Sequence, residues 1–310
     1  MKRRRPVTVA IIGAGKVGSV LGKVLVQRGA KIVAVVSRRL SSARKAGRFL
    51  GCRNVSTSLS SIPGNTNFIF ITTPHNAVAR VAGDLSHLGG LDFKRVAVCH
   101  ASGMLTAEVL EPLRRRGVTV FSFHPLQTFP REFPVSKIVP TVRGIYYGVD
   151  GSAAGIRMAK LLARMLEGKV IVIPPERRAF YHAACVLASN HLATMLSILE
   201  EMFGTLKTSK KDFFPVFEPI IMATLRNIKS SSPAEALSGP VARGGVETVA
   251  DHFNAIKSES PEMVPYFSRL SLESVTLAVK KGSIDMTQAD TLRSLIHLYE
   301  ETNAHHKEIQ

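Results

Sequence analysis

Short apolar runs alternate with amphipathic stretches through the first half of the chain. The runs predict buried strands, which lie at 7–12, 31–36, 67–71, 95–98, 118–123, 145–149 and 169–173. Between two of them, at 76–88, Val78, Val81, Ala82 and Leu85 recur at helical spacing, and a further helix is predicted at 106–116. Repeated strand–helix units of this length predict an α/β fold with a doubly wound, mostly parallel sheet.

The pattern changes after Pro174-Pro175, because only helical periodicity follows. Helices are predicted at 177–203, 212–228, 245–256, 261–280 and 288–302. Thr287, with Asp290 three residues later, predicts a capping box for the last helix. A chain of 310 residues suits two domains of about 150 residues each. We therefore expect a sheet domain at 1–174 and an all-helical domain at 175–310.

A glycine-rich turn directly follows the first predicted strand and opens a predicted helix. Its residues are Gly13, Ala14, Gly15, Lys16, Val17 and Gly18. Gly13 permits a tight turn, Gly15 lets the backbone approach a pyrophosphate, and Gly18 lets the helix pack closely on the strand. The helix N-terminus offers free N–H groups to phosphates. In this context the turn predicts a dinucleotide site, the alternative being an ordinary strand–helix turn.

The end of the second strand favours NADP over NAD. An NAD site usually has an Asp or Glu there, whereas this chain has Ser37, Arg38 and Arg39. No acidic residue precedes Asp84, and the first 83 residues hold 15 Lys or Arg. Ser37 and Arg38 can bind a 2′-phosphate, and Arg39 adds positive field. Thr73 and Pro74, which follow the strand 67–71, complete the predicted cofactor site; the alternative is a solvated basic loop.

Polar residues also follow the next two strands, where ligands bind in doubly wound folds. His100 and Ser102 come after one strand and His124 after the other. Hydride transfer requires a proton donor or acceptor, and histidine titrates near neutral pH. We expect His124 in this role, since Pro125 restricts its backbone, with Ser102 binding substrate.

The first predicted helix of the second domain adds His182 and Asn190. The apolar run from Ala183 to Ala188 suggests that this helix is buried. We expect Asn190 to orient the substrate with Ser102, and His100 and His182 to support His124. Each histidine has an ordinary alternative, as a loop residue or as a hydrogen-bonded core residue. Arg243, before a predicted helix, could hold an anion.

Composition narrows the classes of protein. A formal net charge of +18 invites nucleic-acid binding, but the chain has no Trp, zinc-finger spacing or RNA-binding aromatic pattern. No membrane span or signal peptide is expected. The three cysteines lie far apart without metal-ligand spacing, so we expect no metal and a cytoplasmic location.

The chain resembles a bacterial family that joins an N-terminal Rossmann-like domain to a C-terminal helical domain of unknown function. The resemblance rests on residues 13–18, 100–103, 123–129, 181–192 and 239–244. It implies an NADP oxidoreductase of the 6-phosphogluconate dehydrogenase-like superfamily, whose members dimerise through the helical domain. His124-Pro125 is similar to a motif of prephenate dehydrogenases, whose histidine contacts a substrate hydroxyl. The lysine that hydroxyacid dehydrogenases place four residues before their asparagine is Val186 here, which shifts the acid–base role to histidine.

Together these features predict an NADP(H)-dependent oxidoreductase that acts on a small, anionic carbonyl, imine or hydroxy compound. The nicotinamide is expected in a cleft between the domains, and the chain is expected to form a homodimer through its C-terminal helices. Two alternatives remain: an NADP(H)-binding sensor or scaffold without turnover, and a nucleic-acid binder that uses the basic N-terminal half. Nucleic-acid binding would fall steeply with salt.

Overall fold

The computed structural model describes residues 6–205 and 213–307. The chain forms two compact units, Met1–Ser189 and Asn190–Gln310. The boundary expected at 174 marks the change from strands to helices. The two compact units divide further along the chain, after Ser189. The reason is that the first helix after the sheet packs against the sheet through Arg178 and Tyr181.

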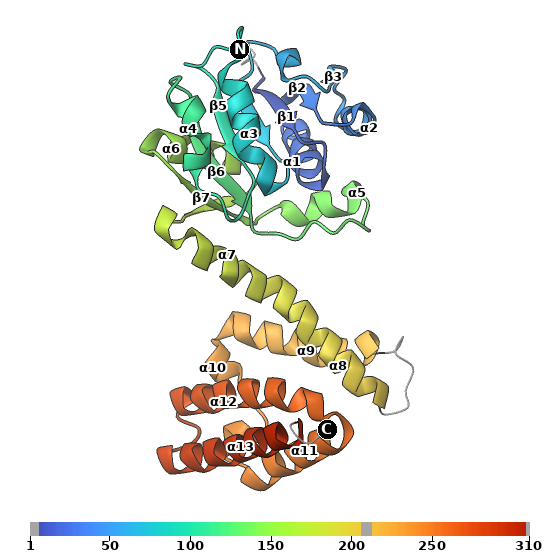
Figure 1. Cartoon of the computed structure of the whole chain (residues 1–310), viewed down its shortest axis with the longest axis vertical. Helices are drawn as coiled ribbons and strands as arrows, with labels where there is room; N and C mark the ends of the chain where they lie inside the picture. Colours follow the sequence, from blue (N-terminus) through green and yellow to red (C-terminus); the bar gives the residue numbers. More distant parts are fainter. Residues whose placement is uncertain (1–5, 206–212, 308–310) are drawn as a thin grey trace. The chain divides into compact units, whose positions relative to one another are not determined.

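A single eight-stranded sheet forms the centre of the first unit (Figure 1). The strand order is β3-β2-β1-β4-β5-β6-β7-β8, and all neighbours are parallel except β6 and β7. This order confirms the predicted doubly wound, mostly parallel sheet. The two-residue strand β3 is too short to give a sequence pattern. The strands are β1 (Thr8–Ile12), β2 (Lys31–Val36), β3 (Val55–Ser56), β4 (Phe68–Ile71), β5 (Ala97–His100), β6 (Thr119–Pro125), β7 (Tyr146–Gly151) and β8 (Lys169–Val172).

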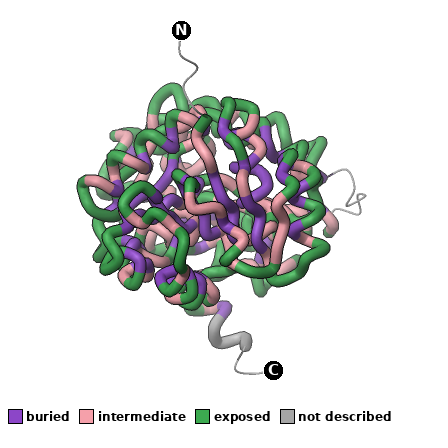
Figure 2. The backbone as a smooth tube through the Cα atoms, turned by 90° about the horizontal axis from the view of Figure 1, so that it is seen from above, coloured by how far each residue is buried: buried purple, intermediate pink, exposed green. Residues whose placement is uncertain are grey.

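Helices cover both faces of the sheet, because alternate strand residues face opposite sides. Val9 and Ile11 of β1 join one core with α1 (Lys16–Gln27), α2 (Leu40–Leu50) and α6 (Ala153–Met165). Ala10 and Ile12 join the other core with α3 (His75–Ser86) and α4 (Glu111–Arg114). Figure 2 shows the buried strands in purple and the exposed outer sides of the helices in green.

One predicted helix of the first unit is broken. A 3₁₀ turn, η2 (Ala107–Leu110), precedes α4 in place of a continuous helix at 106–116. Pro112 lies in the first turn of α4, and its missing N–H prevents an α-helical bond back to residue 108. Between β6 and β7 the chain forms α5 (Val135–Ile138) and the 3₁₀ turn η3 (Val139–Val142).

The helical stretch that follows β8 is long and apolar. It comprises α7 (Arg178–Val186), a π-helical turn (Leu187–His191) and α8 (Leu192–Thr205). The stretch Pro175–Thr205 is long and apolar enough to span a bilayer by length and composition, with a mean hydropathy of 1.3. The absence of a membrane span stays a prediction, because helices that protein covers can have the same composition. The predicted burial of the helix that carries the apolar run 183–188 is wrong within the single chain, where Phe180 is 76% exposed and Leu187 66% exposed.

The described part of the second unit is entirely helical, as predicted. Phe253 of α11 stacks on Tyr299 of α13 with ring centroids 5.0 Å apart, and Val275 of α12 is fully buried in the same core. The predicted helix start at 212 lies outside the described residues. The helices are α9 (Phe213–Ser230), α10 (Pro233–Ala236), α11 (Val246–Glu259), α12 (Val264–Lys281) and α13 (Met286–Lys307).

The capping box of α13 lies two residues before the predicted position. The backbone N–H of Gln288 donates to the Asp285 carboxylate at 2.8 Å, and the N–H of Asp285 donates to the Gln288 side chain at 3.0 Å. Asp285 and Gln288 thus take the places predicted for Thr287 and Asp290.

Candidate functional site

The glycine turn packs directly against the end of β4. Gly13 has a φ of +106°, and a Cβ there would lie 2.7 Å from the carbonyl carbon of Thr72. A Cβ at Gly18 would lie 2.6 Å from the carbonyl oxygen of Gly13. The Thr72 hydroxyl donates to that oxygen at 2.7 Å and fixes the turn. Gly13 and Gly18 are therefore required by close packing inside the protein.

Gly15 has a different role, since a Cβ there would meet no atom within 4 Å. It is the N-cap of α1 and provides no side-chain cap for the first turn. The open space above Gly15 allows a ligand to approach the free N–H groups of α1.

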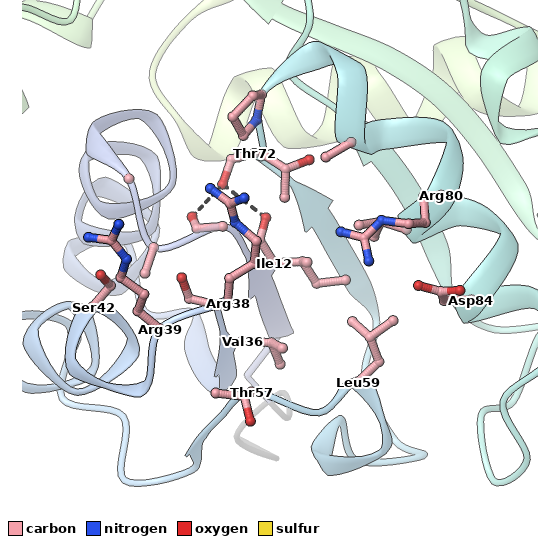
Figure 3. Close-up of a pocket in the computed structure, with 18 of the residues that line it drawn as sticks. Ile12, Val36, Arg38, Arg39, Ser42, Thr57, Leu59, Thr72, Arg80 and Asp84 are labelled. Carbon is pink, nitrogen blue, oxygen red and sulfur yellow. Dashed lines mark hydrogen bonds between the residues drawn. The ribbon is translucent and has the colours of Figure 1, made fainter.

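A cavity of about 570 Å³ opens beside this turn, at the point where the strand order reverses between β1 and β4 (Figure 3). Eight of the predicted cofactor residues line it: Gly13, Ala14, Gly15, Ser37, Arg38, Arg39, Thr73 and Pro74. The other three lie outside the lining. The Lys16 ammonium donates to the Phe133 carbonyl, Val17 packs on the core, and Gly18 lies beneath the turn.

The cavity also has walls that the sequence reasoning missed. Arg80 and Asp84 come from α3 and lie across the cavity from Arg39 and Ser42 (Figure 3). Arg131 reaches the cavity from the loop after β6. The sequence signal for Arg80 and Asp84 was their helical spacing on the predicted helix 76–88. Nothing local marked Arg131, since it follows no predicted strand end.

The charge of the cavity fits a phosphate-rich nucleotide. No ion pair joins any residue that the structure describes to the four lining arginines, Arg38, Arg39, Arg80 and Arg131. Asp84 is the single carboxylate among the lining residues. The Thr73 hydroxyl is buried without a hydrogen-bond partner in the described chain. Unpaired guanidinium groups and an unpartnered hydroxyl are what a bound phosphate and ribose would satisfy.

A second group of polar residues lies at the same edge of the sheet. The parallel register aligns Ile71 with His100 and His100 with Ser122, so His124 extends two residues beyond this line. His124 Nδ1 and the Tyr181 hydroxyl are hydrogen-bonded at 2.8 Å. The His124 and His182 rings have centroids 6.0 Å apart. His124, Tyr181 and His182 therefore form one cluster within the first unit.

Two glycines make room for this cluster. A Cβ at Gly103 would overlap the His182 ring and lie 3.0 Å from His124 Nε2. A Cβ at Gly148, which pairs with His124 across β6 and β7, would overlap the Tyr181 hydroxyl. A side chain at either position would displace the cluster.

The two predicted residues at the end of β5 are bound mainly to backbone. His100 is fully buried, with Nε2 bonded to the Thr106 carbonyl at 3.0 Å and Nδ1 accepting the Ser102 N–H at 3.2 Å. Both of its ring nitrogens are therefore occupied. The Ser102 hydroxyl accepts the N–H groups of Met104 and Leu105 at 3.3 and 3.2 Å, which leaves its own proton to donate.

The protonation states of the cluster follow from burial. Burial lowers the pKa of His124 to about 4, with further lowering by the nearby charges of Arg178, His182 and His100. Burial likewise lowers the pKa of His100 to about 4. Burial raises the pKa of the Tyr181 hydroxyl. At neutral pH, His124 and Tyr181 are therefore both uncharged.

A buried ion pair holds the cluster in place. Arg178, at the start of α7, is 1% exposed and lies 3.3 Å from Asp150 as an ion pair through Nη1, without hydrogen-bond geometry. Its Nε and Nη2 donate to the carbonyls of Gly103 and Ser102, both at 2.9 Å. Arg178 thus ties α7 to the 102–103 turn. The sequence signal for this pair was a lone acid, Asp150, in an apolar strand.

Asn190 is the first residue of the second compact unit and lies in the π-helical turn. The other four predicted catalytic residues, His100, Ser102, His124 and His182, lie in the first unit. Sequence reasoning missed Tyr181 as a partner of His124, although it directly precedes His182.

The sheet order and the glycine turn define a Rossmann-like fold. Residues 1–125 match the Rossmann-like domain family, and residues 145–274 match the domain of unknown function DUF2520. The chain therefore carries a Rossmann-like N-terminal domain followed by a DUF2520 domain.

Solved structures share this fold. A protein from Bacteroides fragilis, provisionally named an NADP oxidoreductase, has a TM-score of 0.66 and 22% identity over 87% of this chain and 98% of its own. A protein from Thermotoga maritima has a TM-score of 0.64 and 21% identity over 94% and 99%. A pyrroline-5-carboxylate reductase from Coxiella burnetii has a TM-score of 0.60 and 15% identity over 89% and 97%. No curated protein matches the sequence.

Proposed function

We propose that this chain is an NADP(H)-dependent oxidoreductase that acts on a small, anionic carbonyl, imine or hydroxy compound. The observation that carries the proposal is the arginine-rich cavity beside the glycine turn. The names of the similar structures, which include reductases and an NADP oxidoreductase, support it.

Within the cavity, the N-terminus of α1 and Gly15 would hold the pyrophosphate. Ser37, Arg38 and Arg39, at the end of β2, would bind the 2′-phosphate. Thr73 would use its unpartnered hydroxyl on the ribose. The bound nicotinamide supplies or accepts the hydride.

The protein itself would supply the proton. His124 has a neutral ring whose Nε2 makes no hydrogen bond to any described residue. Ser102 has a hydroxyl proton free for a substrate oxygen. We assign proton transfer to His124 and substrate binding to Ser102, with His182 and His100 in support.

Replacing Arg38 with alanine should weaken NADPH binding by about 1.5–3 kcal/mol, the contribution of a charge-assisted hydrogen bond. This corresponds to a Kd increase of about tenfold to a hundredfold, measured by calorimetry. NADH binding should change little, because NADH has no 2′-phosphate.

Arg53→Ala is the matched control, since Arg53 is an exposed arginine outside this cavity. Equal binding of NADH and NADPH by the wild type would refute the NADP preference, and binding of neither would refute the cofactor assignment. Tight NADPH binding without turnover of any carbonyl, imine or hydroxy compound would favour the sensor function.

We also propose that the chain is a homodimer. Large apolar side chains on α9 are exposed in the single chain, Val216 at 54% and Ile220 at 65%, and Phe180 and Leu187 on the preceding helices are also exposed. A second copy would remove this apolar surface from water. Light scattering at micromolar concentration should give twice the chain mass. Ile220→Glu should reduce the mass toward that of the monomer, whereas Tyr266→Glu, at an exposed site on α12, should not. A monomeric wild type would contradict the proposal.

A further inference from the structure

We propose that Tyr181 fixes the tautomer of His124 that carries its proton on Nε2, so that His124 donates this proton to the oxygen of a carbonyl substrate during reduction. The inference rests on the proposed function for the source of the hydride. It deepens that function by giving Tyr181 a positioning role, and the step is written for a carbonyl compound, one of the three proposed substrate classes.

The first support is the placement of the Tyr181 hydroxyl. It lies over β7 in the space that Gly148 leaves, beside the strand position paired with His124. There it bonds His124 Nδ1 at 2.8 Å. The Tyr181 ring is held from its own helix, because the Arg178 guanidinium lies 5.3 Å from the ring centroid. The hydroxyl therefore has a defined position relative to one nitrogen of His124.

The direction of this hydrogen bond follows from the chemistry of the two groups. A phenol hydroxyl is a stronger acid than a neutral imidazole N–H, and an unprotonated ring nitrogen is a stronger acceptor than a phenol oxygen. Tyr181 therefore donates to Nδ1, and the His124 proton is on Nε2. A hydrogen-bond partner on one ring nitrogen commonly sets the state of the other.

The Nε2 atom of His124 lies beside Gly103 and close to the His182 ring. A Cβ at Gly103 would lie 3.0 Å from this atom, and Gly103 has no side chain. Among the described residues, none is hydrogen-bonded to Nε2. His124 thus presents an N–H donor beside the end of β5.

Burial keeps this donor neutral, and the groups that face it add to the effect. Burial lowers the pKa of His124 to about 4, and Arg178, His182 and His100, which face it, lower it further. Burial also raises the pKa of Tyr181; Cys185 raises it further, whereas Arg178 lowers it. A neutral imidazole can act as an electrophile toward a carbonyl.

In the proposed step, a bound nicotinamide would supply the hydride that reduces the carbonyl carbon and would itself be oxidised. The carbonyl oxygen gains the proton of His124 Nε2 as the N–H bond breaks. His124 Nδ1 takes the Tyr181 proton, and the phenolate that forms near Arg178 takes a proton from solvent water. The hydroxide ion left from that water leaves to bulk solvent, and the product is an alcohol.

The test combines Tyr181→Phe with a nitrogen NMR readout. In the wild-type protein at pH 7, the ¹⁵N shifts of His124, assigned with His124→Asn, should show a proton on Nε2 alone. Tyr181→Phe should give a mixture of both tautomers. With a small carbonyl compound that the wild type reduces, Tyr181→Phe should lower kcat about 10²-fold or more while the KM for NADPH stays unchanged.

Tyr266→Phe is the matched control, since it removes an exposed hydroxyl on α12. Gly148→Ala provides a second variant, because it displaces the hydroxyl and leaves Tyr181 intact. It should give the same mixture of tautomers. A wild-type His124 with its proton on Nδ1, or unchanged tautomers in both variants, would overturn the inference and leave the proposed function standing. Absence of NADPH binding would instead refute the proposed function, whatever the NMR result.

Discussion

Replacement of His124 by asparagine should lower the turnover of NADPH-dependent reduction by about 10²–10⁴-fold, the usual contribution of a general acid or base. The reason is geometric. His124 has one ring nitrogen bonded to Tyr181 and the other without a partner in the described chain, beside Gly103. The affinity for NADPH, measured by calorimetry, should remain close to that of the wild type, because His124 does not line the arginine-rich cavity.

His297→Asn is the control, because His297 lies on α13 and its side chain is 56% exposed. If His124→Asn retained wild-type turnover, proton transfer would have to be assigned to another group of the cluster. A loss of NADPH affinity in parallel with turnover would instead show that His124 contributes to cofactor binding.

Replacement of Arg178 by methionine should destabilise the first unit by about 3–5 kcal/mol, the cost of leaving a buried charge without its partner. Asp150 would remain buried, and the carbonyls of Ser102 and Gly103 would lose their donors. Urea unfolding followed by circular dichroism gives the free energy of unfolding directly.

Arg177→Met is the matched control, because Arg177 precedes Arg178 and is exposed. It should change the free energy of unfolding by less than about 0.5 kcal/mol. The double variant Arg178→Met with Asp150→Asn should be less destabilised than the sum of the single variants, since the two groups interact. An effect of Arg178→Met below about 1 kcal/mol would contradict a tight structural role for the pair.

The sheet could be predicted from the sequence because each strand has its own local signal. The runs 7–12 and 31–36 are apolar and β-branched, and both are buried strands in the structure. At 106–116 the helical pattern favours one helix, whereas Pro112 interrupts it. The spacing of residues alone does not show which of these two effects prevails. For the last helix, Asp285 with Gln288 and Thr287 with Asp290 have the same spacing, and only the folded backbone selects one pair.

The candidate site was less predictable, because its contacts join residues that are distant in sequence. The strand ends gave His100, Ser102 and His124, since parallel strands bring their carboxyl ends to one edge. The partner of His124 comes from α7, which is separated from β6 in the sequence by two strands, β7 and β8, and two α-helices, α5 and α6. Its position depends on the burial of Arg178 and on the small size of Gly148, which no local pattern encodes.

The reversed direction of β7 has a consequence for how the nucleotide cavity is built. A parallel connection after β6 would leave for the opposite edge of the sheet, usually as a helix. Because β7 is antiparallel, the chain between the two strands stays at the ligand edge, and this connection carries Arg131 to the cavity wall. The Phe133 carbonyl anchors it to Lys16 of the glycine turn. The connection thus links the wall of the nucleotide cavity to the core, because Ile138, Val139 and Val142 of the same segment are buried there.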